Sequence, residues 1–538
     1  MQEAMDEANF SHDLLIGLTP EQREAVMSPA RRLLVRATAG SGKTHVLTLR
    51  IQRRVVDRET EPDQILAMTF TRKAGDELRK RLFRAGIRDV RAGTFHRAAL
   101  NIVTQYRNDH HLRPLTLEPN RRKLVSALAI QLRESGELKL EDWQLPRLEQ
   151  EIGWALSQGF NGATYAKVAR RQRREAPLAP AQLAEILDRY VGLTRSRGQL
   201  DFDLLLSEAI TLLRDEPDVL ASFRYRNRAL YVDETQDMNP LQFMLLRQMA
   251  GDDPDLFCVG DPNQSIYGFN GAAPSLLTDI LATWPDTVVL DLTRNHRSTA
   301  NIIAVANTLL EPGARGIEPA KDEGDVPLVR VYDTDEQEAE HVATWLAAKH
   351  HPGSPWHSLA VLARTNAQLE LIASYLDAAD IPYERRGPEH SPASDLLAAD
   401  LSTRRLDEPD HDAVALSTIH RSKGLEFQHV AAIGWAEGQL PHYNATSPEQ
   451  LAEEQRLAYV ALSRAEQSLL ITWSRGRNDP RYPDRHPSRF LAPIEAVIAD
   501  IERRNAPLTG DARKARLDAI KASLTESLAQ IEESAKTR

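Results

Sequence analysis

The sequence predicts an α/β protein with two domains, each built around a parallel β-sheet, and three observations lead to this prediction. Short runs of apolar, β-branched residues alternate with amphipathic stretches, which is typical of a parallel sheet covered by helices. A helical stretch over about residues 97–198 interrupts this pattern, and the pattern begins again after about residue 325. At about 150 residues per domain, a chain of 538 residues has room for about three or four domains.

The composition is that of an ordinary globular protein, with 42% hydrophobic and 27% charged residues. The 67 Lys and Arg residues against 77 Asp and Glu residues give a net charge of −10, which argues against wholesale coating of nucleic acid but allows a local basic groove. The single cysteine, Cys258, excludes an intrachain disulfide and any site built from several cysteines. The acidic N-terminus lacks a signal segment, and no apolar run approaches the roughly 20 residues that span a bilayer. We therefore expect a cytoplasmic protein with no membrane partner.

The first sheet domain is expected to comprise residues 1–96 and 201–298. Its predicted strands are the apolar runs Leu33–Ala37, Ile65–Thr69, Ala229–Asp233, Leu256–Gly260 and Val288–Leu292. Residues 97–200 have little strand character and carry basic clusters at Arg121–Lys123 and Arg170–Arg174. We expect them to form a helical accessory insertion in this domain.

The second sheet domain is expected to comprise residues 299–387 and 412–499, with a charged helical tail over 500–538. Its predicted strands are Leu328–Tyr332, Leu359–Ala363, Ala413–Thr418, Val430–Gly434 and Leu469–Trp473, and its predicted helices cover 336–349, 367–379 and 449–464. Residues 388–411 are rich in Asp, Ser and Pro and are too few to form a domain, so we expect a loop there.

A loop of small residues follows the first predicted strand, where residues 37–44 read ATAGSGKT and a helix begins. Backbone N–H groups of such a loop can surround phosphate oxygens at the helix N-terminus. A strict P-loop has Gly where this chain has Ala37, and a strand–helix turn that binds nothing remains the alternative. As an ATP site, the loop would bind phosphates with Ala39, Gly40, Ser41, Gly42 and Lys43, and would offer the Thr44 hydroxyl to Mg²⁺.

Two adjacent carboxylates, Asp233 and Glu234, follow the predicted strand that begins at residue 229. The carboxyl ends of parallel strands are where such sheets bind ligands. There Asp233 can hold Mg²⁺ and Glu234 can accept a proton from an attacking water. Adjacent acids are also common in solvated turns, and only the phosphate loop upstream favours the catalytic interpretation.

Further motifs occur in a fixed order: LTPEQREAV (18–26), TFTRKAGDELRKRL (69–82), GTFHRAAL (93–100), YVDETQDMNPLQ (231–242), VGDPNQSIYGFNGA (259–272), LTRNHRST (292–299), LSTIHRSKGLEF (416–427), EEQRLAYVALSRA (453–465) and PSRFL (487–491). From about Leu18 to Leu491, this set resembles the UvrD/Rep/PcrA helicases of superfamily 1. The resemblance implies two RecA-like P-loop domains and an ATP-dependent DNA helicase or translocase that moves on single-stranded DNA, 3′ to 5′, by hydrolysing Mg-ATP between them.

The resemblance also implies roles for individual residues. Gln22 would contact the adenine, Glu426 the ribose, and Gln264 would sense the γ-phosphate. Arg297 and Arg464 would stabilise the charge that develops during phosphoryl transfer. Aromatic faces stack on unpaired bases without reading their sequence, and the residues that match the single-strand channel are Phe70, His96, Tyr267, Phe269 and His420.

The chain departs from the family's pattern at several positions. His45 and His296 stand where relatives usually carry the Arg and Tyr that sandwich the adenine, so we expect weaker adenine binding with some pH dependence. Asn270 and Gln455 each replace a usual Arg. Relatives also insert a large helical domain where this chain has only about residues 388–411, which predicts a compact motor with weak strand separation.

Three alternatives remain open from the sequence. The chain could strip proteins from DNA without unwinding it, or could be an ATP-gated regulatory subunit of a nuclease or defence complex. RNA as the track is a weaker alternative. DNA-stimulated ATPase activity of the isolated chain favours a motor, whereas activity that needs a partner favours the gate; a nuclease or repair protein as partner is left open.

Overall fold

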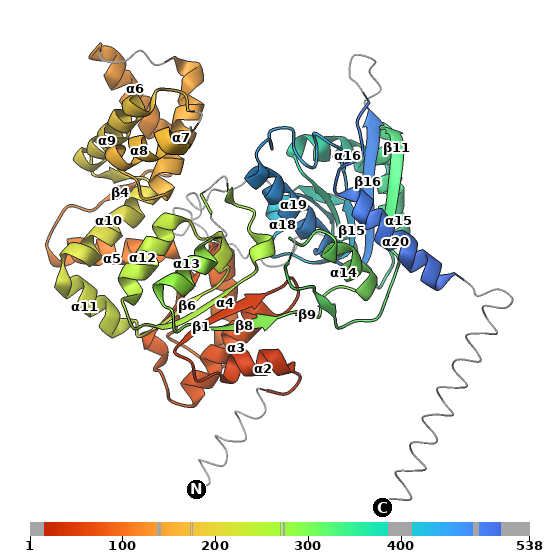
Figure 1. Ribbon diagram of the computed structural model, residues 1–538, viewed down its shortest axis with the longest axis horizontal. Coiled ribbons are helices and arrows are strands. Elements are labelled where there is room, and N and C mark those ends of the chain that lie inside the picture. Colours follow the sequence, from red (N-terminus) through yellow and green to blue (C-terminus); the bar gives the residue numbers. More distant parts are fainter. Residues whose placement is uncertain are drawn as a thin grey trace, which may run out of the picture.

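The computed structural model describes residues 15–136, 141–172, 174, 176–268, 271–272, 275–311, 313–385, 412–476 and 484–506. Two six-stranded sheets, parallel throughout, form two lobes that lie side by side, and a helical part extends from the first lobe (Figure 1). The predicted α/β class with two parallel-sheet domains is confirmed. No helix in this part of the chain is long and apolar enough to cross a membrane.

The first sheet has the strand order β3-β2-β6-β7-β1-β8. Its strands are β1 (Arg32–Ala37), β2 (Ile65–Thr69), β3 (Arg91–Thr94), β6 (Ala229–Val232), β7 (Asp255–Gly260) and β8 (Val288–Leu292). The helices of this lobe are α2 (Pro20–Met27), α3 (Lys43–Val56), α4 (Arg72–Arg84), α5 (Phe95–Asp109), α10 (Phe202–Asp215), α11 (Pro217–Arg226), α12 (Pro240–Ala250) and α13 (Leu276–Thr283). Successive side chains of β1 enter two different cores, Leu34 one and Leu33 and Val35 the other, because helices cover both faces.

The helical insertion consists of α6 (Arg121–Glu134), α7 (Leu145–Ser157), α8 (Gly162–Gln172) and α9 (Pro180–Ser196). Two short parallel strands, β4 (Thr116–Leu117) and β5 (Gln199–Leu200), stand at its base. The predicted start at residue 97 falls inside α5. That helix packs in the core of the first lobe through Phe95, Ala99 and Ile102, whereas the insertion has a separate core that begins near Leu115.

The second sheet has the strand order β11-β16-β15-β12-β14-β13. Its strands are β11 (Leu328–Thr334), β12 (Leu359–Ala363), β13 (Tyr383–Arg385), β14 (Val414–Thr418), β15 (Phe427–Ala432) and β16 (Ala465–Gly476). The helices are α14 (Ala300–Asn307), α15 (Asp335–Lys349), α16 (Asn366–Ala378), α18 (Ile419–Ser422), α19 (Pro448–Leu462) and α20 (Leu491–Asn505). A small parallel pair, β9 (Arg294–Asn295) with β10 (Glu318–Pro319), lies where the chain crosses between the lobes.

Most predicted strands agree with the observed ones to within two residues at each end, and the larger differences lie in the second sheet. The strand predicted at Val430–Gly434 runs instead over Phe427–Ala432, and β16 is longer than predicted at both ends. The two edge strands β3 and β13 were not predicted. The predicted loop 388–411 lies outside the described residues, as does the tail beyond residue 506.

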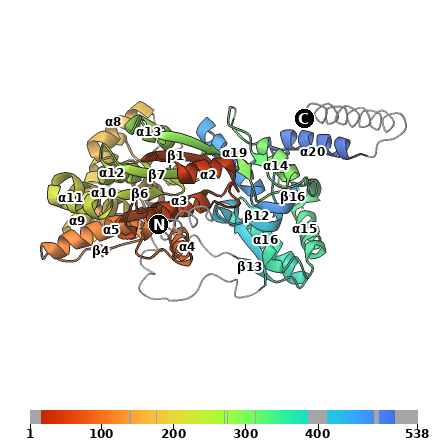
Figure 2. The same ribbon diagram turned by 90° about the horizontal axis from the view of Figure 1, so that it is seen from below.

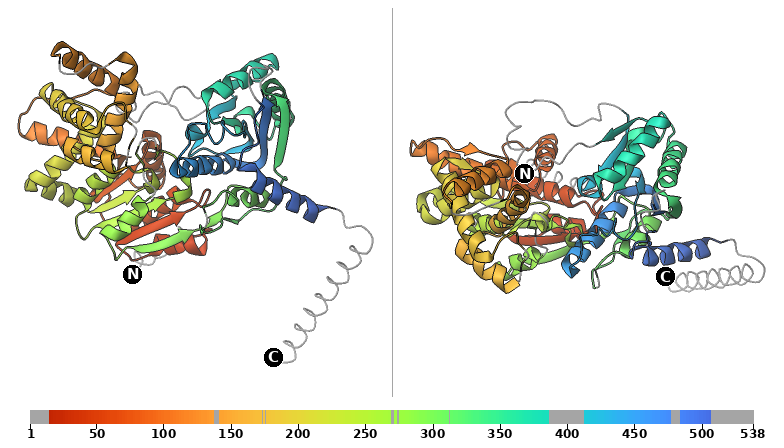
Figure 3. Two further views of the ribbon diagram at one scale, coloured as in Figure 1. Left: turned by 45° about the horizontal axis from the view of Figure 1, so that its top comes forward. Right: turned by 90° about the horizontal axis from the view of Figure 1, so that it is seen from above.

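The two lobes meet along α19, which lies on the side of the second lobe that faces the first (Figures 1 and 2). Ala39 and Ile266 of the first lobe are buried within a hydrophobic cluster formed mainly by the second. The insertion lies at the opposite end of the molecule from β11 and α20 (Figure 3). The contact between the two lobes, formed by α19 with Ala39 and Ile266, is called the joint below. It brings together segments that are far apart in the sequence.

Candidate functional site

The phosphate loop connects β1 to α3 and is shaped by two glycines with left-handed backbone conformations, Gly40 (φ 67°) and Gly42 (φ 83°). A Cβ atom on Gly42 would lie 2.9 Å from Nε2 of Gln22, so a side chain there would collide with the adjacent α2 segment. Lys43 is the first residue of α3. The loop thus presents its backbone N–H groups at the positive end of a helix of 14 residues, which favours bound phosphate.

The segment around β9 (Arg294–Asn295) crosses between the lobes and is called the crossing segment below. It lies directly against the phosphate loop. The backbone N–H of His296 donates to the carbonyl of Gly40 (2.9 Å), and Nδ2 of Asn295 donates to the carbonyl of Ala39 (2.7 Å). The N–H of Ala39 in turn donates to Oη of Tyr459 on α19 (3.3 Å). A Cβ on Gly40 would lie only 2.5 Å from Asn295 Nδ2, so this close approach requires glycine.

The two predicted acidic residues lie beside the loop at the carboxyl end of β6. The Thr44 hydroxyl donates to Oδ2 of Asp233 (3.1 Å), and the backbone N–H of Glu234 donates to Oδ1 (2.9 Å). Burial, with the charge of Glu234, raises the pKa of Asp233 to about 6. Burial also acts to raise the pKa of Glu234, but the charges of Lys43 and Lys423 outweigh it and bring that pKa down to about 2. Glu234 is therefore a carboxylate at neutral pH.

The hydroxyl and carboxylate oxygens of Thr44 and Asp233 suit Mg²⁺, which binds oxygen ligands and takes one or two from the protein and the rest from substrate phosphates and water. No group of three or more His, Cys, Asp or Glu side chains within the described ranges could hold a metal without such a substrate. The residues present thus fit a magnesium ion that arrives with a nucleotide.

Arg464 follows α19 and connects the second lobe to the first. Its guanidinium is buried, with 1% of the residue exposed, and Nη2 donates to Oε1 of Gln264 (3.3 Å). Its remaining nitrogens donate to the carbonyls of Val460 and Leu425, both at 3.1 Å. Burial and the neighbouring charge of Arg297 lower the pKa of Arg464 to about 9, so it is still charged at pH 7. The Nε2 atom of the same Gln264 carboxamide donates to Oδ2 of Asp261 (2.7 Å).

Arg297 lies on the crossing segment near Arg464. Its Nε donates to Oε2 of Glu426 (2.8 Å), and Nη1 donates to the carbonyl of Ser463 (3.2 Å). Glu426, predicted to contact a ribose, thus forms an ion pair with an arginine in this structure, and its side chain is 57% exposed. The pair lies beside the phosphate loop, since a Cβ on Gly40 would also approach Cβ of Arg297.

The part of the site that is expected to contact the adenine consists of α2, His45 and His296. Thr19 and Gln22 form a capping box at the start of α2, and Gln22 Nε2 donates to the carbonyl of Ser41 in the phosphate loop (2.9 Å). His45, in the first turn of α3, and His296, on the segment that crosses between the lobes, are both exposed at the protein surface. Partial burial lowers the pKa of both imidazoles, so both rings are predominantly uncharged at neutral pH.

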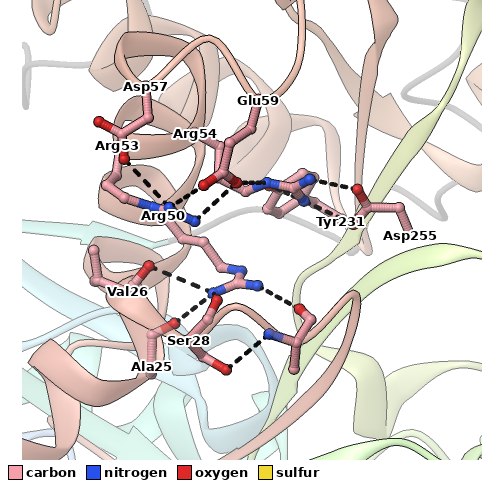
Figure 4. Close-up of polar contacts among 11 residues, drawn as sticks. Ala25, Val26, Ser28, Arg50, Arg53, Arg54, Asp57, Glu59, Tyr231 and Asp255 are labelled. Carbon is pink, nitrogen blue, oxygen red and sulfur yellow. Dashed lines mark hydrogen bonds and ion pairs between the residues drawn. The ribbon is translucent and has the colours of Figure 1, made fainter.

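A buried arginine that the sequence analysis missed fixes α2 against the phosphate-loop helix. Arg50 of α3 is 2% exposed, and its guanidinium donates to four carbonyls at the end of α2 and just beyond it (Figure 4). The acceptors and their distances are Ala25 (2.9 Å), Val26 (3.4 Å), Ser28 (2.9 Å) and Ala30 (2.8 Å). One turn further on, Arg53 and Arg54 bind Glu59, and Arg54 also binds Asp255 (Figure 4).

Three of the predicted strand-contacting residues lie together at the joint. The rings of Phe70 and Tyr267 stack with centroids 5.0 Å apart, and Tyr267 Oη donates to the backbone carbonyl of His420 (3.4 Å). Lys423 Nζ lies 5.2 Å from the Tyr267 ring centroid. Burial and the charge of Arg364 lower the pKa of His420 to about 3, so its ring is neutral.

Of the other two predicted residues, His96 does not join this group. His96 is 8% exposed and packs edge-on against Phe202 of α10, with ring centroids 5.6 Å apart, because α5 buries this face in the core of the first lobe. Burial lowers its pKa to about 4. Phe269 lies outside the described residues, and so does Asn270.

Side chains of the second lobe hold the segment 264–268, and the sequence analysis did not single them out. Oε1 of Glu453 accepts the N–H of Gly268 (2.9 Å), and Nε of Arg456 donates to the carbonyl of Ser265 (2.7 Å). Lys423 Nζ donates to the carbonyl of Gln264 (2.5 Å) and forms a buried ion pair with Asp237 (2.6 Å). All three lie in the quoted motifs, which is the signal that could have pointed to them.

Comparison with known sequences gives matches along most of the chain. The sequence profile of the UvrD/REP helicase N-terminal domain matches residues 18–284, and that of the UvrD-like helicase C-terminal domain matches residues 290–390 and 394–476. The ATP-dependent DNA helicase UvrD2 of Mycobacterium tuberculosis (strain ATCC 25618 / H37Rv) is 30% identical over 605 residues, which cover 94% of this chain and 85% of that protein. The ATP-dependent DNA helicase UvrD1 of the same strain is 28% identical over 682 residues, covering 92% and 87%.

Proposed function

This chain belongs to the UvrD/REP helicase family and is an ATP-dependent DNA helicase, and from that premise we propose that it moves 3′ to 5′ along single-stranded DNA by hydrolysing Mg-ATP between its two lobes. One observation carries the part of the proposal that places ATP hydrolysis between the lobes. Arg464 of the second lobe reaches Gln264 of the first, 3.3 Å away, beside the phosphate loop. The proposal places this activity in the cytoplasm.

In the proposed mechanism, the loop residues Gly40, Ser41, Gly42 and Lys43 bind the phosphates of ATP, and Gln22, His45 and His296 bind the adenine. Ala39, also predicted to bind phosphate, donates its N–H to Tyr459 instead. Thr44 and Asp233 would hold Mg²⁺, which neutralises phosphate charge when it is bound. The Glu234 carboxylate accepts a proton from water as the water oxygen bonds to the γ-phosphorus and the bond from that phosphorus to the leaving ADP oxygen breaks. Arg297 and Arg464 stabilise the charge that develops on the γ-phosphoryl oxygens.

Hydrolysis is coupled to movement through the short segment 264–268. Gln264 lies three residues before Tyr267, so one segment carries both the nucleotide-sensing side chain and an aromatic ring that would stack on a base. Side chains of the second lobe hold both ends of it, through Arg464 at one end and Glu453 at the other. A change in the distance between the lobes therefore displaces the strand-contacting ring.

The test is ATP turnover with and without single-stranded DNA by the wild type, Lys43→Ala and Glu234→Gln. Both variants should lose ATP hydrolysis by about 100-fold or more, while Lys167→Ala, a surface control on α8, should behave as the wild type. Normal turnover by either site variant would refute the site. Wild-type activity that appears only with a partner protein would favour the ATP-gated subunit instead.

The direction of movement is tested separately on single strands labelled with a fluorophore at either the 5′ or the 3′ end. Stopped-flow traces should show arrival at the 5′ end, with a delay that grows with strand length, and no length-dependent arrival at the 3′ end. The opposite result would reverse the proposed direction and leave the ATP site unaffected.

A further inference from the structure

A groove with a cavity volume of about 320 Å³ runs along the outer edge of the first sheet. Its wall is β3, an edge strand that pairs only with β2 among the described strands. The opposite wall comes from α5 and from the end of α11. Since nothing in the described chain pairs with the outer edge of β3, the backbone N–H and C=O groups of that edge are available to a partner strand.

The groove is lined by positive side chains although the chain as a whole carries a net charge of −10. Four arginines line it, and no carboxylate does among the lining residues, all of which the structure describes: Arg79, Arg91, Arg97 and Arg226. Arg79 forms an ion pair with Asp76, so the other three arginines carry the positive charge of the groove. Arg91 donates to the backbone carbonyls of Asp63 and Arg226, and it forms no direct ion pair among the described residues. Burial and the charge of Arg226 lower the pKa of Arg91, and the charge of Asp63 offsets part of that effect.

The centre of the groove is apolar, and one buried polar atom there lacks a partner. Ala92, Ala98, Ile102 and Phe223 line this part, each less than 10% exposed. Asn227 is 7% exposed; its Nδ2 donates to the carbonyl of Phe223 (2.7 Å), but its Oδ1 accepts no hydrogen bond from the described residues. A ligand that fits here needs negative charge at its ends, an apolar middle and N–H donors.

We infer that this groove binds an extended acidic segment of a partner protein, which adds to β3 as a further strand. Along an extended chain, residues i, i+2 and i+4 point to the same side and span about 13 Å. This spacing places one carboxylate near Arg91 and Arg226 at the start of β3, an apolar side chain on the central floor, and a second carboxylate near Arg97, whose side chain lies against Gly93. Arginine binds carboxylates through paired N–H donors.

A nucleic-acid strand fits the same groove less well. Arginines bind backbone phosphates too, but a single strand gains much of its affinity from bases stacked on exposed aromatic faces. Phe223 is the aromatic residue in the lining, and it is 6% exposed, so it offers no face to a base. The apolar floor and the open strand edge both favour a polypeptide.

The test is fluorescence polarisation of a labelled peptide, acetyl-Ser-Asp-Thr-Leu-Thr-Asp-Ser, with the full-length chain at low salt. The wild type should bind it, and Arg226→Glu should weaken binding by at least about ten-fold. Arg330→Glu, an exposed arginine on β11, is the matched control and should bind as the wild type does. The same peptide with Lys in place of its first Asp should reverse the order, binding Arg226→Glu more tightly than the wild type.

The reversed order is the decisive readout, because a misfolded variant would lose both peptides. Absence of wild-type binding, or equal binding by Arg226→Glu, would overturn the inference. The DNA-stimulated ATPase of Arg226→Glu should equal that of the wild type, which separates this surface from the proposed motor. If Arg226→Glu instead loses affinity for single-stranded DNA and no peptide binds, the groove belongs to the DNA track.

Discussion

At the scale of single residues, His296 tests the adenine site. The hydrogen bond from its backbone N–H to Gly40 fixes its position beside the phosphate loop, and its neutral ring offers less stacking area than tyrosine does. His296→Tyr should lower the KM for ATP by about three- to ten-fold, since an aromatic pair contributes about 0.5–1.5 kcal/mol. Steady-state KM measurements check this. An unchanged or higher KM would count against stacking by residue 296.

The pH dependence of this variant provides a second readout. Partial burial and the charge of Arg294 lower the pKa of His296. The ring therefore gains its proton only when the pH falls below about 6.5, the ordinary pKa of histidine. We therefore expect the KM of the wild type to change below pH 6.5 rather than around neutrality. His296→Tyr should remove part of that change, and His45 accounts for the rest.

Gly40 lies where the segment that crosses between the lobes packs directly against the phosphate loop. Gly40→Ala places a methyl group 2.5 Å from Asn295 Nδ2 on a backbone with positive φ, so the crossing segment must move away from the loop. We expect kcat to fall by about ten-fold or more, because small displacements of catalytic groups have large effects on rate. Gly17→Ala is the matched control: Gly17 also has positive φ but nothing lies within 4 Å of its Cβ position. It should cost about 1 kcal/mol of stability and leave kcat unchanged.

At the scale of elements, the attachment of α2 to α3 by Arg50 determines where Gln22 lies. Arg50→Met leaves four carbonyls without their buried donor, and each unsatisfied group costs about 1–3 kcal/mol. The free energy of unfolding should fall by about 3 kcal/mol or more in chemical denaturation, and the KM for ATP should rise. Arg50→Lys keeps the charge but has fewer hydrogen-bond donors, so its free energy of unfolding should lie between those of Arg50→Met and the wild type. Full stability in Arg50→Met would contradict this account.

The helix α19 provides the second element-scale prediction, about the coupling of hydrolysis to movement. Glu453→Ala removes the acceptor for the Gly268 N–H and frees one end of the strand-contacting segment, whereas Glu453→Gln keeps an acceptor oxygen. We expect Glu453→Ala to slow translocation about three-fold or more while DNA-stimulated ATPase changes less. Glu453→Gln should retain most of the coupling. Parallel loss of both activities in Glu453→Ala would indicate damage to the ATP site instead.

Sequence patterns predicted the elements that are apolar and missed those that are not. Central strands such as β1 and β12 are continuous apolar runs, so their positions were predicted to within a residue. The edge strands β3, Arg-Ala-Gly-Thr, and β13, Tyr-Glu-Arg, are short and carry no such run. The other two edge strands, β8 and β11, are longer and richer in apolar residues, and both were predicted. The helix α5 reads like the insertion helices that follow it, and only its packing assigns it to the first lobe.

For the site, motif order predicted which residues to examine but not what each side chain contacts. Thr44, Asp233, Gln264, Arg297 and Arg464 do lie together, whereas His96 is buried against Phe202. Asn295 and Tyr459 contact residues that are far apart from them in the chain, and Arg50 is a charged residue buried in the core. Helical periodicity predicts neither feature. The roles of these residues remain predictions for mutagenesis.

At the scale of the whole molecule, the second lobe leaves little room for an insertion like that of the family's larger members. Only residues 386–413 lie between β13 and β14. We expect the lone chain to translocate on single strands but to separate long duplexes weakly, because these residues are too few to form a second helical domain that would engage the duplex. Single-turnover unwinding measured beside translocation tests this. Robust unwinding of long duplexes by the monomer would contradict it, and rescue by an added partner would support it.

The contacts of Ala39 have a consequence for the timing of the cycle. Both of its backbone polar groups are bonded across the joint, to Asn295 and to Tyr459, and its side chain lies in the core of the opposite lobe. Separating the lobes breaks these hydrogen bonds and exposes that core to water, so we expect lobe separation to be a separate activated step. We expect ADP to dissociate only after this step. Product release, rather than bond cleavage, is then expected to limit the rate of the cycle.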